Sequence, residues 1–402
     1  MGRDFINLNL RHLSAFDAVA QRGSISQAAG IVNLSQPAIT NAIGGIENRI
    51  KARLFHRRPR GMMLTNVGAA FHFRVKRAFK LLNAGIITSQ SPSTNAISGI
   101  EKRITVARLK TLIAIKKSGS YSAAARELGI AQPTIYRAAK DLEATLGMAL
   151  FEVSGRNLRL TRAGEALERN ARLAAAELAQ GMDEVETLLG REAGRIRIGA
   201  LPLARATILA PAIDLSFESQ AGLRIEVDDG PYPELLHAVR TGALDILVGA
   251  MRRPSPGADI TQEELFLDRL GVFCGPGHPM LSAKKIERAD LAAFPWVLPR
   301  RETPTRAFFD QALGPLFDRP PKALVETSSM VLMRALLQSH QRLTLISRAQ
   351  VATEVQQGQL CELPIALGDT PRAIGFTCRS YWFPTEAQKG FLAVLRAIAR
   401  QF

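Results

Sequence analysis

One short segment of the chain carries side chains that proteins use to read the edges of base pairs. The segment is predicted to be a helix that reaches about Leu146. Its polar outer face carries Gln132, Tyr136, Arg137 and Lys140. Amide and guanidinium groups can each form two hydrogen bonds with one purine in the major groove. Such a helix is suited to lie in a major groove with this face toward the bases.

The residues before this helix predict the element that must hold it. Ser120 or Ser122 can cap a short helix over Ala123–Leu128. Gly129 can end that helix in the left-handed conformation, and Pro133 suits the first turn of the next one. Two helices joined by so short a break are typical of a helix-turn-helix, in which the second helix enters the groove.

A hairpin is predicted directly after the recognition helix. The stretch LFEVSGRNLRLTRAG alternates around a Ser-Gly-Arg-Asn turn, and it carries Arg156 and Arg159. Arginines on such a wing can bind phosphates or enter a minor groove. Together these segments predict a winged helix-turn-helix.

The same pattern occurs twice in the chain. A shift of 96 residues superposes Leu13 on Leu109 and Gly68 on Gly164, and about seventeen positions between them agree without a gap. A gapless repeat places the same turns at the same positions, so we interpret it as one domain duplicated in tandem. The first wing, LFHRRPRGMMLTNVG, carries Arg57, Arg58 and Arg60.

These motifs resemble the winged helix-turn-helix of the LysR-type bacterial transcriptional regulators. The matching segments are FDAVAQRGSISQAA, SQPAITNAIGGIE and LFHRRPRGMMLT in the first copy, and GSYSAAA, AQPTIYRAAKDLEATLG and LFEVSGRNLRLTRAG in the second. Ordinary members have one such module, so the duplication is a departure. The resemblance implies a regulator that binds double-stranded DNA at a promoter or operator, with RNA polymerase as a partner if it activates. The expected DNA contacts are Ser35, Gln36, Pro37, Thr40, Asn41, Arg57, Arg58, Arg60, Gln132, Pro133, Thr134, Tyr136, Arg137, Lys140, Arg156 and Arg159.

The two copies differ where they would touch DNA. The first has Asn41 at the position of Arg137, and Gly44-Gly45 lie inside its recognition helix, each costing about 1 kcal/mol relative to alanine. We therefore expect the first module to add mostly phosphate affinity and the second to read more bases. The alternative is that one module, the first before the second, serves packing or dimerisation and does not bind DNA.

Positive charge is concentrated in the first quarter of the chain. The 402 residues have a net charge of +16, and residues 1–90 hold 13 Lys and Arg against 3 Asp and Glu. A concentrated basic region indicates a polyanionic partner, either nucleic acid or an anionic membrane surface. The DNA-binding motifs favour nucleic acid.

A polar linker and a long helix are predicted around the second module. The linker spans residues 89–104, between a first module over residues 1–88 and a second over 105–164. Residues 165–190 are predicted to be a linker helix with a one-sided apolar seam, Leu167, Ala171, Ala174, Leu178, Met182, Val185 and Leu189. In the family the equivalent helix dimerises, which implies a homodimer or homotetramer. The alternative is that the helix lies on its own domain.

Strands and helices alternate in residues 191–402, which predicts an α/β fold with mostly parallel sheets. Its segments GRIRIGALP, LLHAVRTGALDILVG and GPGHPM resemble the effector-binding region of the family. That region is built like a periplasmic binding protein, with lobe I expected over 194–270 and 375–402 and lobe II over 271–374. The predicted strands are Arg195–Ile198, Leu223–Val227, Leu244–Val248, Leu270–Cys274, Trp296–Leu298, Leu343–Ile346 and Ala373–Cys378. The fold class is thus two tandem all-α winged domains, a linker helix and a two-lobed α/β effector domain.

Three strand-to-helix junctions could form an effector site. Ligands bind beyond the carboxyl ends of parallel strands, where helix N-termini favour anions. Hydroxyl groups and arginines there suit a small carboxylate or sugar acid, although capping is as good an explanation for any single residue. The candidates are Pro202, Leu203, Arg205, Thr303, Thr305, Arg306, Thr327, Ser328 and Ser329.

Enzymatic function is not predicted. The sequence has no Walker loop, no GxSxG and no HExxH motif, and its six histidines are scattered, so no catalytic residue, cofactor or metal is expected. Three separate cysteines and the absence of a signal-like or membrane-spanning stretch favour the cytoplasm. The remaining rival is an architectural DNA-binding protein with little sequence preference. Such a protein does not need a two-lobed sensor.

Overall fold

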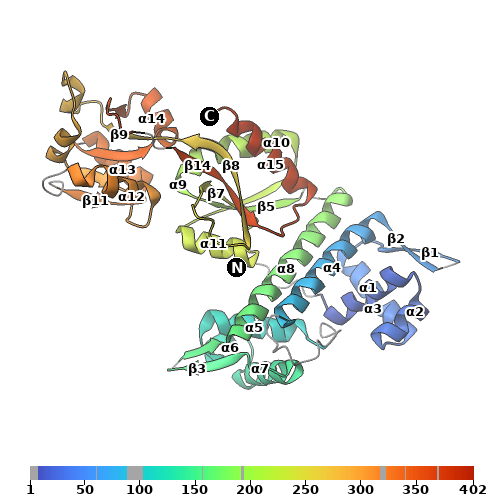
Figure 1. The fold of residues 1–402 in the computed structure, drawn as a ribbon. Coiled ribbons are helices and arrows are strands. Elements are labelled where there is room, and N and C mark those ends of the chain that lie inside the picture. Colours follow the sequence, from blue (N-terminus) through green and yellow to red (C-terminus); the bar gives the residue numbers. More distant parts are fainter. Residues whose placement is uncertain are drawn as a thin grey trace.

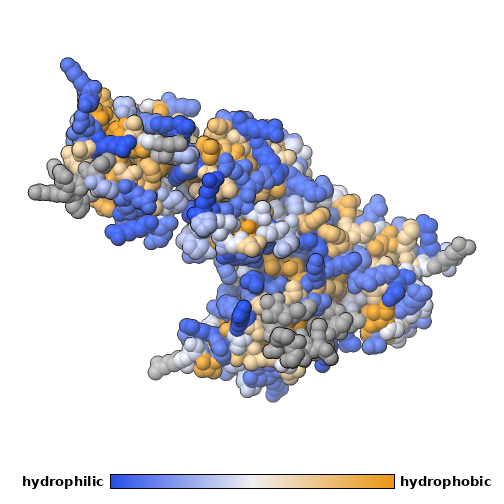
Figure 2. All heavy atoms as spheres, viewed as in Figure 1, coloured by the Kyte–Doolittle hydropathy of each residue, from blue (hydrophilic) through white to orange (hydrophobic). Residues whose placement is uncertain are grey.

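A computed structural model describes residues 8–59, 61–87, 103–155, 157–191, 194–316, 323–339, 341–368 and 371–402. Two winged modules lie at opposite ends of a pair of long helices, and two α/β lobes follow (Figure 1). Hydrophilic side chains cover most of the face in Figure 2, and apolar residues gather there in small separate patches. Among the described helices, none has both the length and the apolar character needed to cross a bilayer.

The two modules have the same elements at the same spacing. The first consists of α1 (Leu10–Arg22), α2 (Ile25–Val32), α3 (Gln36–Ile50), β1 (Phe55–Arg58) and β2 (Gly61–Leu64). The second consists of α5 (Val106–Ser118), α6 (Tyr121–Leu128), α7 (Gln132–Leu146), β3 (Phe151–Ser154) and β4 (Asn157–Leu160). Each bound in the second module lies 96 residues after its counterpart in the first. The duplication predicted from the sequence is therefore a duplication of structure.

Both modules end their helices at the same places, but with different residues. In the second, Gly129 and Gly147 adopt the left-handed conformation after α6 and α7, with φ of 66° and 67°. The first module has Asn33 and Lys51 at these positions, each with a φ of 52°. A left-handed lysine costs about 1–2 kcal/mol because its Cβ crowds the backbone. The first module therefore holds the end of α3 under more strain than the second holds α7.

Each module continues into a long helix, and these two helices pack against each other. They are α4 (Asn66–Ile87) and α8 (Arg162–Leu188). The predicted seam of α8 is buried at Leu167, Ala171, Ala174, Leu178 and Val185, whereas Leu189 is exposed. The expected pairing with another chain is therefore wrong for this seam, because α4 of the same chain covers it. Residues 89–102 of the predicted linker lie outside the described residues.

Lobe I is a five-stranded sheet in the order β6-β5-β7-β14-β8. The strands β5, β6 and β7 are parallel, and β14 runs antiparallel to both of its neighbours. The elements are β5 (Arg195–Ala200), α10 (Ala210–Ser219), β6 (Arg224–Asp229), α11 (Tyr232–Thr241), β7 (Ile246–Ala250), β8 (Ile260–Asp268), β14 (Arg372–Arg379) and α15 (Glu386–Ala399). The sequence did not predict β8, which pairs with β14 along nearly its whole length.

Lobe II is a second five-stranded sheet in the order β11-β10-β12-β9-β13. Its elements are β9 (Leu270–Cys274), β10 (Trp296–Leu298), α12 (Pro304–Ala312), β11 (Leu324–Glu326), α13 (Met330–Ser339), β12 (Leu343–Ser347), α14 (Ala352–Gln356) and β13 (Cys361–Glu362). Leu270 therefore belongs to the second sheet, and the return strand begins at Arg372. The chain passes between the lobes twice, and both points lie a few residues earlier in the sequence than predicted. The reason is that the paired strands β8 and β14 extend to the edge of lobe I.

Lobe I is fixed to the helix pair by buried polar contacts. Arg74 of α4 is fully buried and donates to the carbonyl oxygen of Phe383 at 2.9 Å. Gln180 of α8 donates to Gln388 at the start of α15 at 3.2 Å, and both side chains are buried. These contacts fix the position of lobe I relative to both modules.

Candidate nucleic-acid interface and effector site

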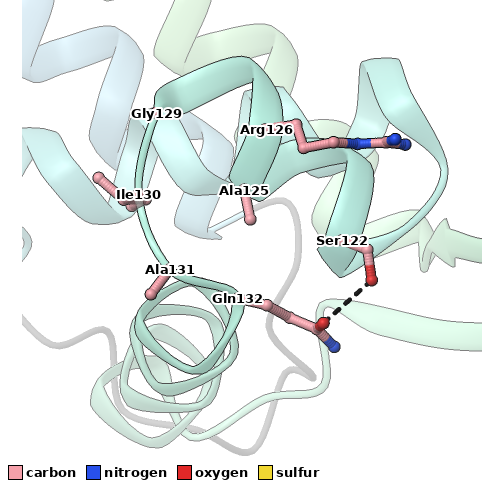
Figure 3. Close-up of a pocket in the computed structure, with 7 residues that line it drawn as sticks. All are labelled: Ser122, Ala125, Arg126, Gly129, Ile130, Ala131 and Gln132. Atoms are coloured by element: carbon pink, nitrogen blue, oxygen red, sulfur yellow. Dashed lines mark hydrogen bonds between the residues drawn. The ribbon is translucent and has the colours of Figure 1, made fainter.

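The second module presents a polar face on α7. Gln132, Pro133, Thr134, Tyr136, Arg137 and Lys140 are all exposed. The hydroxyl of Ser122 in α6 donates to Oε1 of Gln132 at 3.1 Å, beside a hollow between α6 and α7 (Figure 3). This bond leaves the amide NH2 of Gln132 to act as a donor. The sequence-predicted row therefore exists as one surface.

A small aromatic cluster positions Tyr136 on that surface. Its ring meets the ring of Tyr121 edge-on, with centroids 5.4 Å apart, and Tyr121 in turn contacts Phe151 of the wing. Burial raises the pKa of Tyr121. Tyr136 remains about half exposed, with a relative accessibility of 49%. The cluster thus joins α6, α7 and the wing, and it holds one aromatic ring at the outer face.

Lys140 forms an ion pair with Glu143, whose carboxylate also stabilises the fold of the module. Its ammonium group lies 2.9 Å from Glu143, which also accepts backbone N–H bonds from Leu150 and Phe151 at 2.8 and 3.1 Å. Burial alone would raise the pKa of Glu143, but these bonds outweigh burial and hold it below 4.5. Glu143 therefore fixes the start of the wing and holds Lys140 near the face of α7.

The first module presents a smaller and less aromatic face. Gln36, Pro37 and Asn41 are exposed, whereas the Thr40 hydroxyl donates to the backbone oxygen of Gln36 at 3.0 Å. Ser35, expected to touch DNA, caps α3 by accepting from the N–H of Ala38 at 3.3 Å.

A groove takes the place of the tyrosine cluster in the first module. Ile25, Thr40 and Gly44 occupy the positions of Tyr121, Tyr136 and Lys140, and they line an open groove of about 460 Å³ between α3 and the wing. The side chains that fill this space in the second module are therefore replaced by smaller ones in the first.

The wings carry the expected arginines where the structure describes them. Arg57 and Arg58 lie exposed on β1, and Arg159 lies exposed on β4. Arg60 and Arg156 lie outside the described residues. In both modules the wing follows the recognition helix directly, so its arginines are suited to contact phosphates beside the groove that the helix enters.

The carboxyl ends of the parallel strands in both sheets lie at the edges where the chain passes between the lobes, because Ala250 of β7 pairs with Ile374 near the start of β14, and Ser347 of β12 pairs with Leu270 at the start of β9. After β5 the chain forms α9 (Pro202–Ala204) and a π-helix (Arg205–Leu209). The hydroxyl of Thr207 in this π-helix donates to the backbone oxygen of Ala349, just beyond β12, at 3.4 Å. Arg372 donates to Thr305 at the start of α12 at 2.6 Å and to Asp268 at the end of β8 at 2.5 Å. The junctions predicted from the sequence therefore converge between the lobes.

Comparison with known proteins assigns the chain to a protein family. Residues 10–69 and 106–165 each match the family model described as "Bacterial regulatory helix-turn-helix protein, lysR family", and residues 189–400 match "LysR substrate binding domain". The chain belongs to the LysR family of transcriptional regulators. The HTH-type transcriptional regulator GalR of Pseudomonas putida is 30% identical over 395 residues, 97% of each chain. That relative therefore matches both modules and both lobes.

Other relatives match a smaller share of the chain. PcaQ of Agrobacterium fabrum is 29% identical over 281 residues, which are 70% of this chain and 90% of PcaQ. The crystal structure of ArgP from Mycobacterium tuberculosis has a TM-score of 0.53 at 20% identity and covers 73% of this chain and 96% of ArgP. The sequence match thus covers most of PcaQ and the similarity of fold covers nearly all of ArgP, while part of this chain remains unmatched.

Several candidate effector residues of this LysR-family chain have internal partners. Arg306 is buried between Asp310 and Glu326, and Thr305 accepts from Arg372. Thr303, Thr327 and Ser329 accept backbone N–H bonds from Arg306, Ser329 and Leu332 respectively. Arg205 pairs with Asp229 at 3.2 Å. Pro202 and Leu203 form α9, and Ser328 is exposed.

Two arginines that the sequence did not single out have unpaired N–H groups at the junction of the lobes. Nη1 of Arg252 and Nε of Arg372 are buried and have no hydrogen-bond partner among the described residues. Arg252 follows β7 and stacks on the ring of Tyr232, 4.2 Å from its centroid. Burial lowers the pKa of Arg252, and the charge of nearby Arg372 lowers it further. No three His, Cys, Asp or Glu side chains of the described residues group as a metal site.

Buried reactive side chains elsewhere in lobe II have structural roles. Burial raises the pKa of Cys274 to about 12, so its thiol is protonated at neutral pH. His278 is buried and accepts from the N–H of Met280 at 3.2 Å, which makes it a turn residue.

Proposed function

We propose that this chain is a sequence-specific DNA-binding regulator in which both winged modules contact duplex DNA and a small anionic effector binds between the lobes. The two modules have equivalent elements, and each exposes the outer face of its recognition helix. Positive charge around the first module favours a polyanion. The chain would act in the cytoplasm as a homo-oligomer, and an activator would also contact RNA polymerase.

The two modules would divide the work of binding. Both modules carry a glutamine at the start of the recognition helix, Gln36 and Gln132, whereas Arg137 of the second, which can form two hydrogen bonds with a guanine, is replaced by the shorter Asn41 in the first module, whose wing carries more arginines. Phosphate contacts carry no sequence information directly, whereas base contacts do. The second module would therefore set more of the sequence preference, and the first more of the salt-dependent affinity.

One observation supports an anionic effector above all others. Arg252 and Arg372 keep buried N–H atoms without partners at the point where the lobes meet. Leaving a buried donor on a charged group unsatisfied costs more than about 1–3 kcal/mol, and two nearby guanidinium groups also repel each other. A carboxylate between them would satisfy both donors and offset the repulsion. A small carboxylate or sugar acid fits this chemistry.

The contacts around Arg372 suggest how the effector would act. This residue joins Asp268 of lobe I to Thr305 of lobe II, so a ligand bound beside it would bias the angle between the lobes. Lobe I is fixed to α4 and α8 through Arg74 and Gln180. Movement of lobe II against lobe I would therefore change the position of the surface of lobe II relative to the DNA-binding modules. Such a change would reposition neighbouring chains in an oligomer.

A thermal-shift screen of the full chain with small carboxylates and sugar acids tests this proposal. A ligand at one hundred times its Kd stabilises the protein by about 2.7 kcal/mol, which raises Tm measurably. We expect a hit to stabilise the wild-type chain and Arg253→Gln, but not Arg252→Gln. Arg253 is the matched control because it is exposed and pairs with Glu264 at the surface. A hit that stabilises Arg252→Gln equally would contradict this site.

A further inference from the structure

The pairing of α4 with α8 has an internal two-fold relationship. A Cβ built on Gly85 of α4 would lie 2.7 Å from Cβ of Asn170 in α8. A Cβ built on Gly181 of α8 would lie 2.9 Å from Cβ of Arg74 in α4. Gly181 is the equivalent of Gly85 in the second repeat, and Asn170 is the equivalent of Arg74. The two contacts therefore join the same pair of repeat positions, with the roles of the two helices exchanged. Reciprocal contacts of this kind define an isologous interface, which normally joins two copies of one protein.

The buried positions of the two helices repeat in the same way. Ala78 and Leu82 of α4 are buried, and so are Ala174 and Leu178, their counterparts in α8. Each helix also packs on the first helix of its own module, α4 on α1 and α8 on α5. The two modules are thus carried at opposite ends of an antiparallel helix pair, as Figure 1 shows.

Charged residues make this pairing specific for unlike helices. Arg74 and Arg77 of α4 bind Glu177 of α8 at 3.0 and 2.8 Å, and Arg74 also binds Glu184 at 2.6 Å. In α8, the positions equivalent to Arg74 and Arg77 are occupied by Asn170 and Leu173.

Pairing of like helices would lose these ion pairs. Two α8 helices paired in the same way would bury Glu177 against Leu173, and two α4 helices would bury Arg74 without a carboxylate. A buried charge without a partner is strongly unfavourable, so the sequence selects α4 with α8 and rejects either helix with itself.

We infer that one chain is by itself a complete two-module reader of DNA, and that its operator consists of two unlike half-sites. The inference rests on the proposed function, because it requires that both modules bind DNA. The helix pair places α3 and α7 as the two recognition helices of a pseudo-dimer, so one duplex can engage both. Their faces differ at several equivalent positions, among which Thr40, Asn41 and Gly44 replace Tyr136, Arg137 and Lys140.

The unlike faces decide the form of the operator. A symmetric protein pairs with a palindromic site, because each half-site meets the same surface. Here one half-site meets Tyr136 and Arg137, and the other meets Thr40 and Asn41. The preferred operator is therefore non-palindromic, and its orientation fixes the orientation of the chain on the DNA.

Matched substitutions in the two recognition helices test the inference. The full chain is used to select a duplex from a random library, and hydroxyl-radical footprinting locates the protected half-sites. Two variants are then compared, Gln36→Ala with Asn41→Ala in α3, and Gln132→Ala with Arg137→Ala in α7. Three of these four side chains form none of the hydrogen bonds described above. In the Gln132→Ala variant, the hydroxyl of Ser122 can bond to water in place of Gln132, so both variants are expected to fold. Unchanged thermal unfolding verifies it.

The inference predicts that each variant loses protection at a different half-site. Each loss should weaken binding by about 10²–10⁴-fold, because tethering makes the second contact intramolecular. An equimolar mixture of the two variants should stay as weak as either one, even within an oligomer, because no single pair of α4 with α8 then carries two intact modules. Mixing that restores wild-type affinity, or two variants that affect the same half-site, would overturn the inference. Failure of the proposed function is distinguishable, because then the wild-type chain itself would select no site, or one of the two variants would bind as tightly as the wild-type chain.

Discussion

The guanidinium of Arg74, fully buried in α4, donates from Nη1 to Oε2 of Glu177 in α8 at 3.0 Å. This contact joins the long helices of the two modules, and the same Arg74 also binds the loop before α15 of lobe I. Burial alone would lower the pKa of Arg74, but Glu184 and Glu177 raise it above its ordinary value, so Arg74 stays charged. The two long helices and lobe I thus meet at one charged group.

Glu177→Gln should strongly destabilise the helix pair. Removing one partner of a buried ion pair costs up to about 3–5 kcal/mol when the remaining charge is left uncompensated. Here Arg74 keeps its contact with Glu184, whereas Arg77 loses its carboxylate, so the loss should lie toward the lower end of that range. Thermal unfolding of the full chain, with hydrogen exchange to identify the segment that opens, measures this loss. Glu165→Gln is the matched control, because Glu165 pairs with Lys116 at the surface, where such a pair contributes about 0–1 kcal/mol. Equal effects of the two substitutions would contradict the role given to Arg74.

Arg191→Ala should loosen the end of the recognition helix in the first module. Arg191 follows α8 and donates to the backbone oxygens of Ile50 and Lys51 at 3.2 and 2.8 Å, where α3 ends in a strained left-handed residue. Losing these charge-assisted bonds should lower the exchange protection of amides 47–52 about 10-fold or more. Arg224→Ala, at an exposed ion pair in lobe I, serves as the control and should leave these amides unchanged.

The second module should lose stability in acid through Glu143. The folded pKa of this carboxyl lies below 4.5, so its stabilising contribution is complete above pH 4.5 and disappears as the pH falls through the folded pKa. Glu143→Gln should flatten this acid side of the stability profile, below the ordinary pKa of a glutamate, measured as Tm against pH. Glu127→Gln, which alters a surface pair with Lys117, should keep the wild-type profile. A profile that Glu143→Gln leaves unchanged would show that other carboxyl groups are responsible.

Arg137→Ala and Arg57→Ala should weaken DNA binding in different ways. Loss of a base contact at Arg137 should cost about 1–3 kcal/mol and relax the preference at one base pair. Loss of a phosphate contact at Arg57 should weaken binding to all sequences and reduce the slope of log K against log salt by about 1. Titrations of selected and scrambled duplexes at several salt concentrations measure both effects. The division of work between the modules fails if Arg57→Ala leaves the salt slope unchanged.

The modules could be predicted from the sequence because their signals are local. Gly129 ends one helix, Pro133 begins the next, and apolar spacing defines both, so α7 was predicted to its last residue, Leu146. The polar face of α7 followed from the same spacing. Even the small Ser-Gly-Arg-Asn hairpin needs no distant partner to be recognised.

The pairing of α4 with α8 could not be predicted from the same kind of signal. The seam of α8 indicates that a helix covers it, but not which helix, or from which chain. Arg74 interrupts the apolar pattern of α4 and resembles a surface residue, because its partners Glu177 and Glu184 lie more than 100 residues away. Arg252 and Arg372 were missed for the same reason, since only the folded lobes bring their guanidinium groups together.

Sequence-specific binding by both modules is best measured by selecting duplexes from a random library with the full chain and then titrating the selected and scrambled sites. We expect one bounded non-palindromic site, bound about 10³–10⁷-fold more tightly than scrambled duplex, with affinity that falls steeply as salt rises. Equal affinity for every duplex would indicate an architectural protein without sequence preference. No binding at low ionic strength would contradict DNA binding by either module.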